Sequence, residues 1–138
     1  MSASIFLDKN ILLYSISSEP AEQKKKAAAL KLLARTDAGL SVQVLQEFYV
    51  QATRATCADC LPYKLAAGLI HTWTRFAVQP ITLEALTAAL DIKQRHCLSY
   101  WDSAIVAAAL ALGCRELYTE DMTHGLVIGD LRLVNPFL

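Results

Sequence analysis

Four acidic residues lie far apart in the chain, each where the end of a strand or a helix would hold it: Asp8, Glu47, Asp102 and Asp121. Carboxylate oxygens are the ligands that Mg²⁺ and Mn²⁺ prefer, and carboxylates packed together without a cation raise one another's pKa values. If the four converge, they predict a metal site with Asp8, Asp102 and Asp121 as ligands. Glu47 would then hold a second ion or orient a metal-bound water.

Two of these acids are expected at the same edge of a sheet. Asp8 follows the short apolar strand 5–7 and precedes a helical segment at 10–14, and Asp121 comes soon after a second short strand at 117–119. In open α/β sheets the functional crevice lies outside the carboxyl ends of the strands. Both carboxylates should therefore project from one rim.

Helical and strand patterns alternate along the rest of the chain. Helices are expected over 20–35, 44–54, 61–75, 83–97 and 104–112, and strands over 40–42, 76–80 and 131–134, the last as a candidate edge strand. This alternation predicts an α/β fold whose central, mostly parallel sheet is flanked by helices. One compact three-layer domain over residues 1–138 fits best.

Two of the expected helices have distinctive patterns. Thr82 suits the N-cap of the helix 83–97, with Leu83, Leu86 and Leu90 as its buried line. The helix 104–112 is apolar on every side, as expected of a centrally packed helix, and the glycine that follows at 113 is its natural end.

The composition limits the class of protein. The 138 residues suffice for one domain, and 54% hydrophobic with 19% charged residues leaves room for a surface buried by a partner. Thirteen basic and thirteen acidic residues cancel, so any polyanion must meet a local patch. The N-terminus lacks a positive charge before its apolar stretch, and the apolar run 104–114 is too short to cross a bilayer. We expect a soluble, cytoplasmic protein without a membrane segment.

The four cysteines form one C-x-x-C pair, Cys57 and Cys60, with Cys97 and Cys114 elsewhere. No second close pair completes a zinc site, and Cys57 follows a helical stretch instead of a strand, unlike a thioredoxin-type motif. Ordinary reduced cysteines are the prediction.

The sequence contains none of the common motifs for hydrolysis besides these acidic residues. The chain contains no G-x-x-x-x-G-K-[ST] loop, no G-x-S-x-G elbow and no H-E-x-x-H helix. A carboxylate metal site suits phosphodiester hydrolysis, because one ion activates water and a second, if present, stabilises the leaving oxygen.

Four segments, 6–14, 41–48, 98–106 and 117–122, resemble PIN-domain ribonucleases, and among these the VapC-type toxins of bacterial toxin–antitoxin pairs. The resemblance spans nearly the whole chain, with the motifs in the family's order and spacing. It implies a central parallel sheet, a Mg²⁺- or Mn²⁺-dependent endoribonuclease that acts as the toxin of a type II pair, a homodimer, and inhibition by a cognate antitoxin protein. Such an antitoxin would insert an Arg among the carboxylates, where bidentate pairing replaces the cations.

The family's site residues are carried over by position. The acidic quartet corresponds to Asp8, Glu47, Asp102 and Asp121, with a supporting polar residue, a hydroxyl and an auxiliary acid at Asn10, Thr119 and Glu120. Lys9 departs from the family, which usually has Thr there. Its ammonium would contact substrate phosphate, pair with a carboxylate and weaken metal binding, or point away from the site.

Each acid also has an ordinary structural interpretation. Asp8 would cap the helix after it, and Asp102, three residues after Ser99, would belong to a capping box. Glu47 would be a solvated flank of its helix, and Asp121 a turn residue. The lysine run 24–26 would be a solvated face or help to hold RNA. The case for a metal site depends on the set.

Two other functions remain open. A catalytically inactive PIN-like module that binds RNA or protein would account for Lys9 and for the neutral overall charge. A small Asp-based phosphatase would account for an acid after the first strand, but Asn10 occupies the place of its usual second Asp, so this function ranks last.

Overall fold

The computed structural model describes residues 3–55 and 60–138. Its strands form one sheet in the order β3-β2-β1-β4-β6-β5, and every neighbouring pair is parallel except β5 with β6. The strand bounds are β1 (Ile5–Leu7), β2 (Ala38–Ser41), β3 (Ala77–Gln79), β4 (Glu116–Tyr118), β5 (Val127–Ile128) and β6 (Leu131–Val134). The predicted α/β fold with a mostly parallel central sheet is confirmed.

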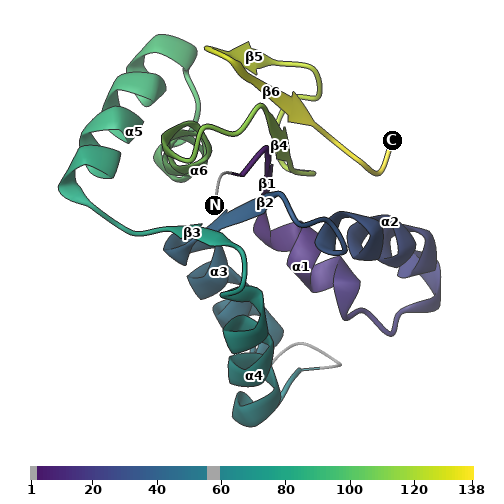
Figure 1. Ribbon diagram of the computed structural model, residues 1–138. Helices are drawn as coiled ribbons and strands as arrows, with labels where there is room; N and C mark the ends of the chain where they lie inside the picture. The colour runs from purple at the N-terminus through teal and green to yellow at the C-terminus, as the bar shows by residue number, and fades with distance from the viewer. Residues whose placement is uncertain (1–2, 56–59) are drawn as a thin grey trace.

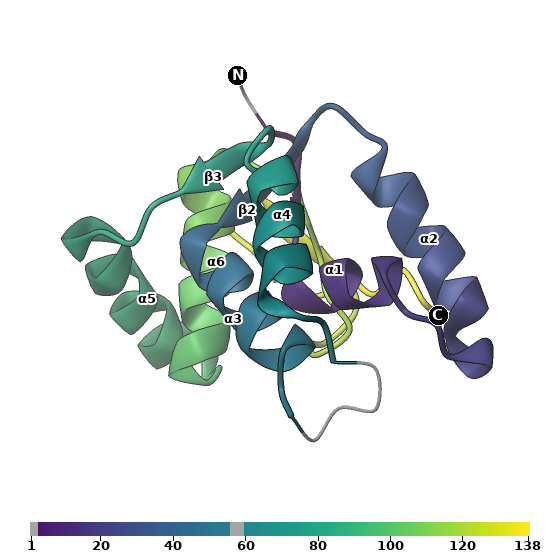
Figure 2. The ribbon, with the colours of Figure 1, turned by 90° about the horizontal axis from the view of Figure 1, so that it is seen from below.

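Helices cover both faces of this sheet (Figure 1). Their bounds are α1 (Lys9–Ser15), α2 (Gln23–Leu33), α3 (Val42–Ala52), α4 (Tyr63–Trp73), α5 (Leu83–His96) and α6 (Tyr100–Ala111), and a single 3₁₀ turn at Pro20–Glu22 leads into α2. Figure 2 shows α5 and α6 together on one side and α1 and α2 on the other, with α3 and α4 between them. Connections of this kind place helices along parallel strands.

Local sequence accounts for where the helices begin and end. Asp8, Ser41, Thr82 and Ser99 are N-caps whose side chains accept hydrogen bonds from amides in the first turn of α1, α3, α5 and α6. Just beyond the end of α6, Gly113 has a φ of 75°, which a residue without a Cβ adopts readily. The sequence therefore fixes the first turn of each helix that carries or follows a candidate acid.

The core lies between the sheet and its helices. β1 is wholly buried, and half of the residues of α6 are buried, including Ile105, Val106 and Ala109. α6 packs against the sheet on one side and α5 on the other, which agrees with its apolar composition on all sides. The prediction of a central helix is confirmed.

Two expectations about individual elements are wrong. β6 lies inside the sheet between β4 and β5, so it is not an edge strand. The edge is β5, whose two residues join β6 through a tight turn at Gly129 and Asp130. A Gly-Asp pair between apolar residues is a hairpin signal that could have revealed this strand.

The second error concerns α5. Leu83, Leu86 and Leu90 are 74%, 40% and 53% exposed, whereas Ala89 and Ile92 are buried. The small alanine lets α5 approach α6 closely, so the helix turns its smaller side chains inward. The leucines form part of an exposed apolar face instead.

The cysteine prediction is tested for three residues. Cys60 and Cys97 are exposed free thiols, and burial raises the pKa of the Cys114 thiol to about 11, so it is protonated at neutral pH. Cys57, the first residue of the C-x-x-C pair, lies outside the described residues. Within residues 3–55 and 60–138, no helix is long and apolar enough to span a membrane.

Candidate functional site

The site forms at the carboxyl edge of the sheet, where β1 and β4 end side by side. Leu7 is paired in register with Tyr118, and the backbone N–H of Asp8 donates to the Tyr118 carbonyl at 3.0 Å. Asp8 and Thr119 therefore leave the sheet next to each other. The expectation that both strands deliver their polar residues to one rim holds for this structure.

Asp8 is buried, with only 2% of its surface exposed. Its Oδ1 accepts a hydrogen bond from the Lys9 backbone N–H at 2.7 Å, and its Oδ2 accepts one from the Thr119 hydroxyl at 2.8 Å. Burial raises the pKa of Asp8, against the attraction of Lys9 and the hydrogen bond from Thr119. Asp8 thus caps α1, as its ordinary interpretation predicted, and still presents a carboxylate to the site.

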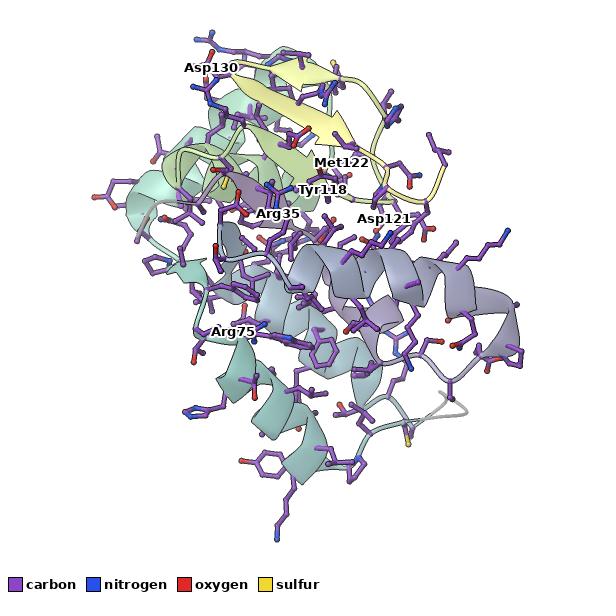
Figure 3. All side chains as sticks on the ribbon, turned by 45° about the vertical axis from the view of Figure 1, so that its right-hand side comes forward. Arg35, Arg75, Tyr118, Asp121, Met122 and Asp130 are labelled. Atoms are coloured by element: carbon purple, nitrogen blue, oxygen red, sulfur yellow. The ribbon has the colours of Figure 1, made fainter. Side chains whose placement is uncertain are left out.

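Thr119 joins the first acid to the last. While its hydroxyl donates to Asp8, the same oxygen accepts a hydrogen bond from the Asp121 backbone N–H at 3.2 Å. This arrangement fixes the turn after β4. Figure 3 shows Asp121 beyond the end of the strand that carries Tyr118, on the side of the molecule where α1 and α2 lie.

Glu47 and Asp102 approach from two helices. α3 starts directly after β2, and Asp102 lies in the first turn of α6, where its backbone N–H donates to the Ser99 hydroxyl at 3.1 Å. Gln43 Nε2 donates to the Trp101 carbonyl at 3.3 Å and so links the starts of the two helices. Burial raises the pKa of Glu47, the Lys9 ammonium opposes this, and the charges of Asp8 and Asp102 add to it. These interactions link Glu47 with Asp8 and with Asp102, and Asp8 in turn interacts with Asp121.

The Lys9 ammonium lies among these carboxylates. Its Nζ is 3.2 Å from Asp121 Oδ2, and its side chain is 20% exposed. Burial disfavours the charge, but the attraction of Asp8, Glu47 and Asp121 outweighs burial and raises the pKa of Lys9. Of the three orientations considered for Lys9, pairing with a carboxylate is the one that the structure adopts.

The donor chemistry of the site fits a divalent cation. Among the described residues, both amide atoms of Asn10 and Oε1 of Glu47 are buried without a hydrogen-bond partner. Unpaired buried polar atoms are costly unless a ligand or water satisfies them, and the two oxygens among them, Asn10 Oδ1 and Glu47 Oε1, are of the kind that Mg²⁺ prefers. However, within residues 3–55 and 60–138, no three His, Cys, Asp or Glu side chains are already arranged as a metal-binding group.

Glu120 is bound by residues of α1 and α2. Its Oε1 accepts a hydrogen bond from the Tyr14 hydroxyl at 2.6 Å, and its Oε2 lies 2.6 Å from Lys25 Nζ. The Lys25 ammonium also lies 4.8 Å from the centroid of the Tyr14 ring. These contacts tie the loop after β4 to α1 and α2, and they suit a structural role better than an auxiliary acid.

Lys25 was missed by sequence reasoning, which interprets the run 24–26 as a solvated face or an RNA contact. Lys24 is exposed, but Lys25 is half-buried in its contact with Glu120. No local signal marks this pair, because its members are 95 residues apart in the sequence. Tyr14 at the end of α1 supplies the third member.

Comparisons with known proteins identify the family and the fold of the chain. Residues 5–124 match the family model of the PIN domain. No curated protein matches the sequence.

Several solved structures share the fold. A toxin–antitoxin complex from Klebsiella pneumoniae is similar with a TM-score of 0.69 at 20% identity, covering 96% of this chain and 98% of that one. VapC20 from Mycobacterium tuberculosis, described as a toxin that cleaves the sarcin–ricin loop, has a TM-score of 0.67 at 22% identity, covering 86% and 92%. DNA-bound VapBC from Salmonella typhimurium has a TM-score of 0.64 at 15% identity, covering 95% and 96%.

Proposed function

Because the chain belongs to the PIN domain family, we propose that it is a metal-dependent endoribonuclease that hydrolyses RNA phosphodiester bonds. The observation that supports the proposal is the buried Asp8 carboxylate at the carboxyl edge of the sheet, which is hydrogen-bonded to Thr119 and lies beside the Lys9–Asp121 ion pair. Glu47 and Asp102 would complete the site from α3 and α6. Residues 1–138 would form a single domain built around this site.

The proposed roles follow from burial and contacts. Asp8, Asp102 and Asp121 would hold Mg²⁺, for which Mn²⁺ can substitute, with the Asn10 amide supporting Asp8 and Thr119 fixing the spacing of Asp8 and Asp121. When bound, the cation supplies a water of lowered pKa and positive charge against the phosphate. Glu47, with a raised pKa and one unpaired buried oxygen, would orient that water and accept its proton at Oε1.

The proposed biological setting is the toxin of a type II toxin–antitoxin pair in the cytoplasm. The similar structures from Klebsiella pneumoniae and Salmonella typhimurium are described as toxin–antitoxin complexes. A cognate antitoxin would inhibit this chain by placing an Arg among the carboxylates, since a guanidinium pairs bidentately with them.

A homodimer is the second proposed assembly. Its support is the exposed apolar face of α5, with Leu83, Leu86 and Leu90, beside Trp101 at the start of α6, which is 64% exposed. Contiguous apolar surface of this kind on a small protein marks an interaction site. A two-fold contact through this face would bury it.

The ribonuclease is tested by incubating structured RNAs with the purified, antitoxin-free protein in Mn²⁺ or EDTA. We expect the wild type to cleave RNA in Mn²⁺ and not in EDTA. Asp102→Asn should cleave at least about 100-fold more slowly, since a neutral amide is a much weaker metal ligand than a carboxylate. The matched control is Asp130→Asn, because this exposed aspartate lies away from Asp121, at the top of the view in Figure 3. It should cleave like the wild type.

An Asp102→Asn variant as active as the wild type would contradict the assignment. The pairing of Lys9 with Asp121 favours a second candidate, an inactive PIN-like module that binds RNA or protein. That candidate predicts RNA binding without cleavage and no Mn²⁺ binding by calorimetry, even at millimolar concentration. RNA cleavage and Mn²⁺ binding, measured on the same purified proteins, therefore distinguish the two functions.

A further inference from the structure

The Lys9 side chain brings a positive charge to the carboxylates of Asp8, Glu47 and Asp121, which are called the acid cluster below. Its Nζ contacts Asp121 Oδ2 at 3.2 Å, and its charge is attracted by Asp8 and Glu47 as well. Lys9 is the first residue of α1, and its backbone N–H is held by Asp8 Oδ1 at 2.7 Å. The capping of α1 therefore fixes the point from which the ammonium extends into the cluster.

We propose that Lys9 is an internal counter-ion that holds the acid cluster in the metal-free protein and competes with a divalent cation for it. This inference rests on the proposed function of the site. An ammonium has three donors and no acceptor, so it cannot be a metal ligand while it is charged, and it repels a second cation at close range. The Lys9 ammonium and a metal ion therefore compete for the same carboxylates.

The ammonium of Lys9 contacts one carboxylate, Asp121, and buried oxygens of Asn10 and Glu47 are left without a hydrogen-bond partner among the described residues. Asn10, only 7% exposed, has both amide atoms buried without a partner among the described residues, and so has Glu47 Oε1. A divalent cation takes several oxygen ligands and waters, whereas the ammonium of Lys9 contacts a single carboxylate. The cluster thus keeps a preference for a metal ion that Lys9 reduces but does not remove.

A hollow beside the cluster gives the displaced side chain a place to go. It has a volume of about 290 Å³ and is lined by Lys9, Tyr14, Glu22, Gln51, Glu120 and Asp121, among others. A lysine has a flexible four-carbon stem, so Nζ can turn into this hollow without a change in the backbone of α1. The Glu22 carboxylate there would receive the ammonium when a metal ion takes Asp121.

The experiment is a calorimetric titration of Mn²⁺ into the metal-free full chain, comparing wild type with Lys9→Met. The variant should bind Mn²⁺ at least about tenfold more tightly, because coupling between two occupants of one site is reciprocal and commonly of this size. Lys31→Met, which removes an exposed charge from α2, is the matched control and should bind like the wild type. Lys9→Arg keeps the cation and should keep the weak binding.

A second readout follows the melting temperature. In EDTA, Lys9→Met should melt below the wild type because the carboxylates lose their counter-ion, and Mn²⁺ should raise its melting temperature by more than that of the wild type. Lys9→Gln, which is neutral but retains a donor, should follow Lys9→Met in both measurements. It serves as the replacement if Lys9→Met fails to fold.

Equal or weaker Mn²⁺ binding by both neutral variants overturns the inference, and so does the absence of Mn²⁺ binding in wild type and variants alike. The ribonuclease is judged separately, by adding the RNA panel to the same proteins. Tighter Mn²⁺ binding by Lys9→Met without cleavage of RNA would support the counter-ion and contradict the nuclease. Cleavage with unchanged Mn²⁺ affinity would do the reverse.

Discussion

At the scale of single residues, the Thr119 hydroxyl organises the candidate site. One oxygen atom donates to the buried Asp8 carboxylate and accepts from the Asp121 backbone. Thr119 is itself 1% exposed, so bulk solvent does not reach this oxygen to take over its hydrogen bonds. A buried carboxylate that loses a hydrogen-bond donor still carries the cost of being removed from water. Removal of this one hydroxyl should therefore lower the stability of the fold.

We therefore predict that Thr119→Val lowers the free energy of unfolding by about 1 to 3 kcal/mol, the usual effect of leaving a buried polar group unpaired. Urea denaturation in EDTA measures this without any contribution from metal binding. Thr119→Ser, which retains the hydroxyl, should be less destabilised. Thr123→Val, at an exposed position in the same loop, should stay within about 0.5 kcal/mol of the wild type. Equal losses for Thr119→Val and Thr123→Val would refute the role of Thr119.

At the scale of elements, β2 packs closely against the residues around Gly39. A Cβ added at Gly39 would lie 2.8 Å from Leu112 Cδ1 and 3.0 Å from Ala3 Cβ, both shorter than ordinary carbon contacts. β2 lies between β1 and β3 and leads into α3, the helix of Glu47. The absence of a side chain at Gly39 therefore allows β2 to lie close to Leu112 and Ala3.

We expect Gly39→Ala to lower the free energy of unfolding by about 1 to 3 kcal/mol, because overpacking forces its neighbours to shift. The same substitution at Gly68 is the matched control. Gly68 is in α4 with nothing within 4 Å of its added Cβ, so Gly68→Ala should stabilise by up to about 1 kcal/mol through helix propensity. Chemical denaturation of both variants tests the pair, and a stabilised Gly39→Ala would contradict the packing argument.

At the scale of the whole molecule, the apolar residues are distributed unequally over the surface. α5 exposes Leu83, Leu86 and Leu90, and α6 exposes Trp101 next to them, on the side opposite to α2 (Figure 2). The other side of the sheet is covered by α1 and α2. An exposed apolar surface of this kind is expected to be buried by a second copy of the chain in the proposed homodimer.

We predict that Leu90→Glu weakens self-association of the chain at least about tenfold, because a charge would have to be buried in the contact. Sedimentation at several concentrations measures the dissociation constant. Leu30→Glu on α2 is the matched control, since Leu30 is 49% exposed, close to the 53% of Leu90, and should leave the association unchanged. A wild type that stays monomeric, or a Leu90→Glu variant that associates normally, would exclude this face as the dimer contact.

The sequence by itself determined the local structure and the positions of the acids along it. N-caps at Asp8, Thr82 and Ser99, apolar periodicity and glycine stops are properties of neighbouring residues, so they predicted most helices and strands. The N-cap at Ser41 was not among them, because Ser41 was assigned to the preceding strand. Because parallel strands end at one rim of a sheet, the order of the elements was enough to predict that Asp8 and Asp121 lie together. The roles of these residues in catalysis stay a prediction.

Only the tertiary structure decided what each side chain meets. Lys9 pairs with Asp121 across 112 positions of sequence and Lys25 with Glu120 across 95, and no local pattern records charges that far apart. The inner place of β6 and the exposed leucines of α5 depend likewise on which surfaces pack most closely. Periodicity identifies the apolar residues of an element, whereas the competition among all packing surfaces of the molecule decides which of them are buried.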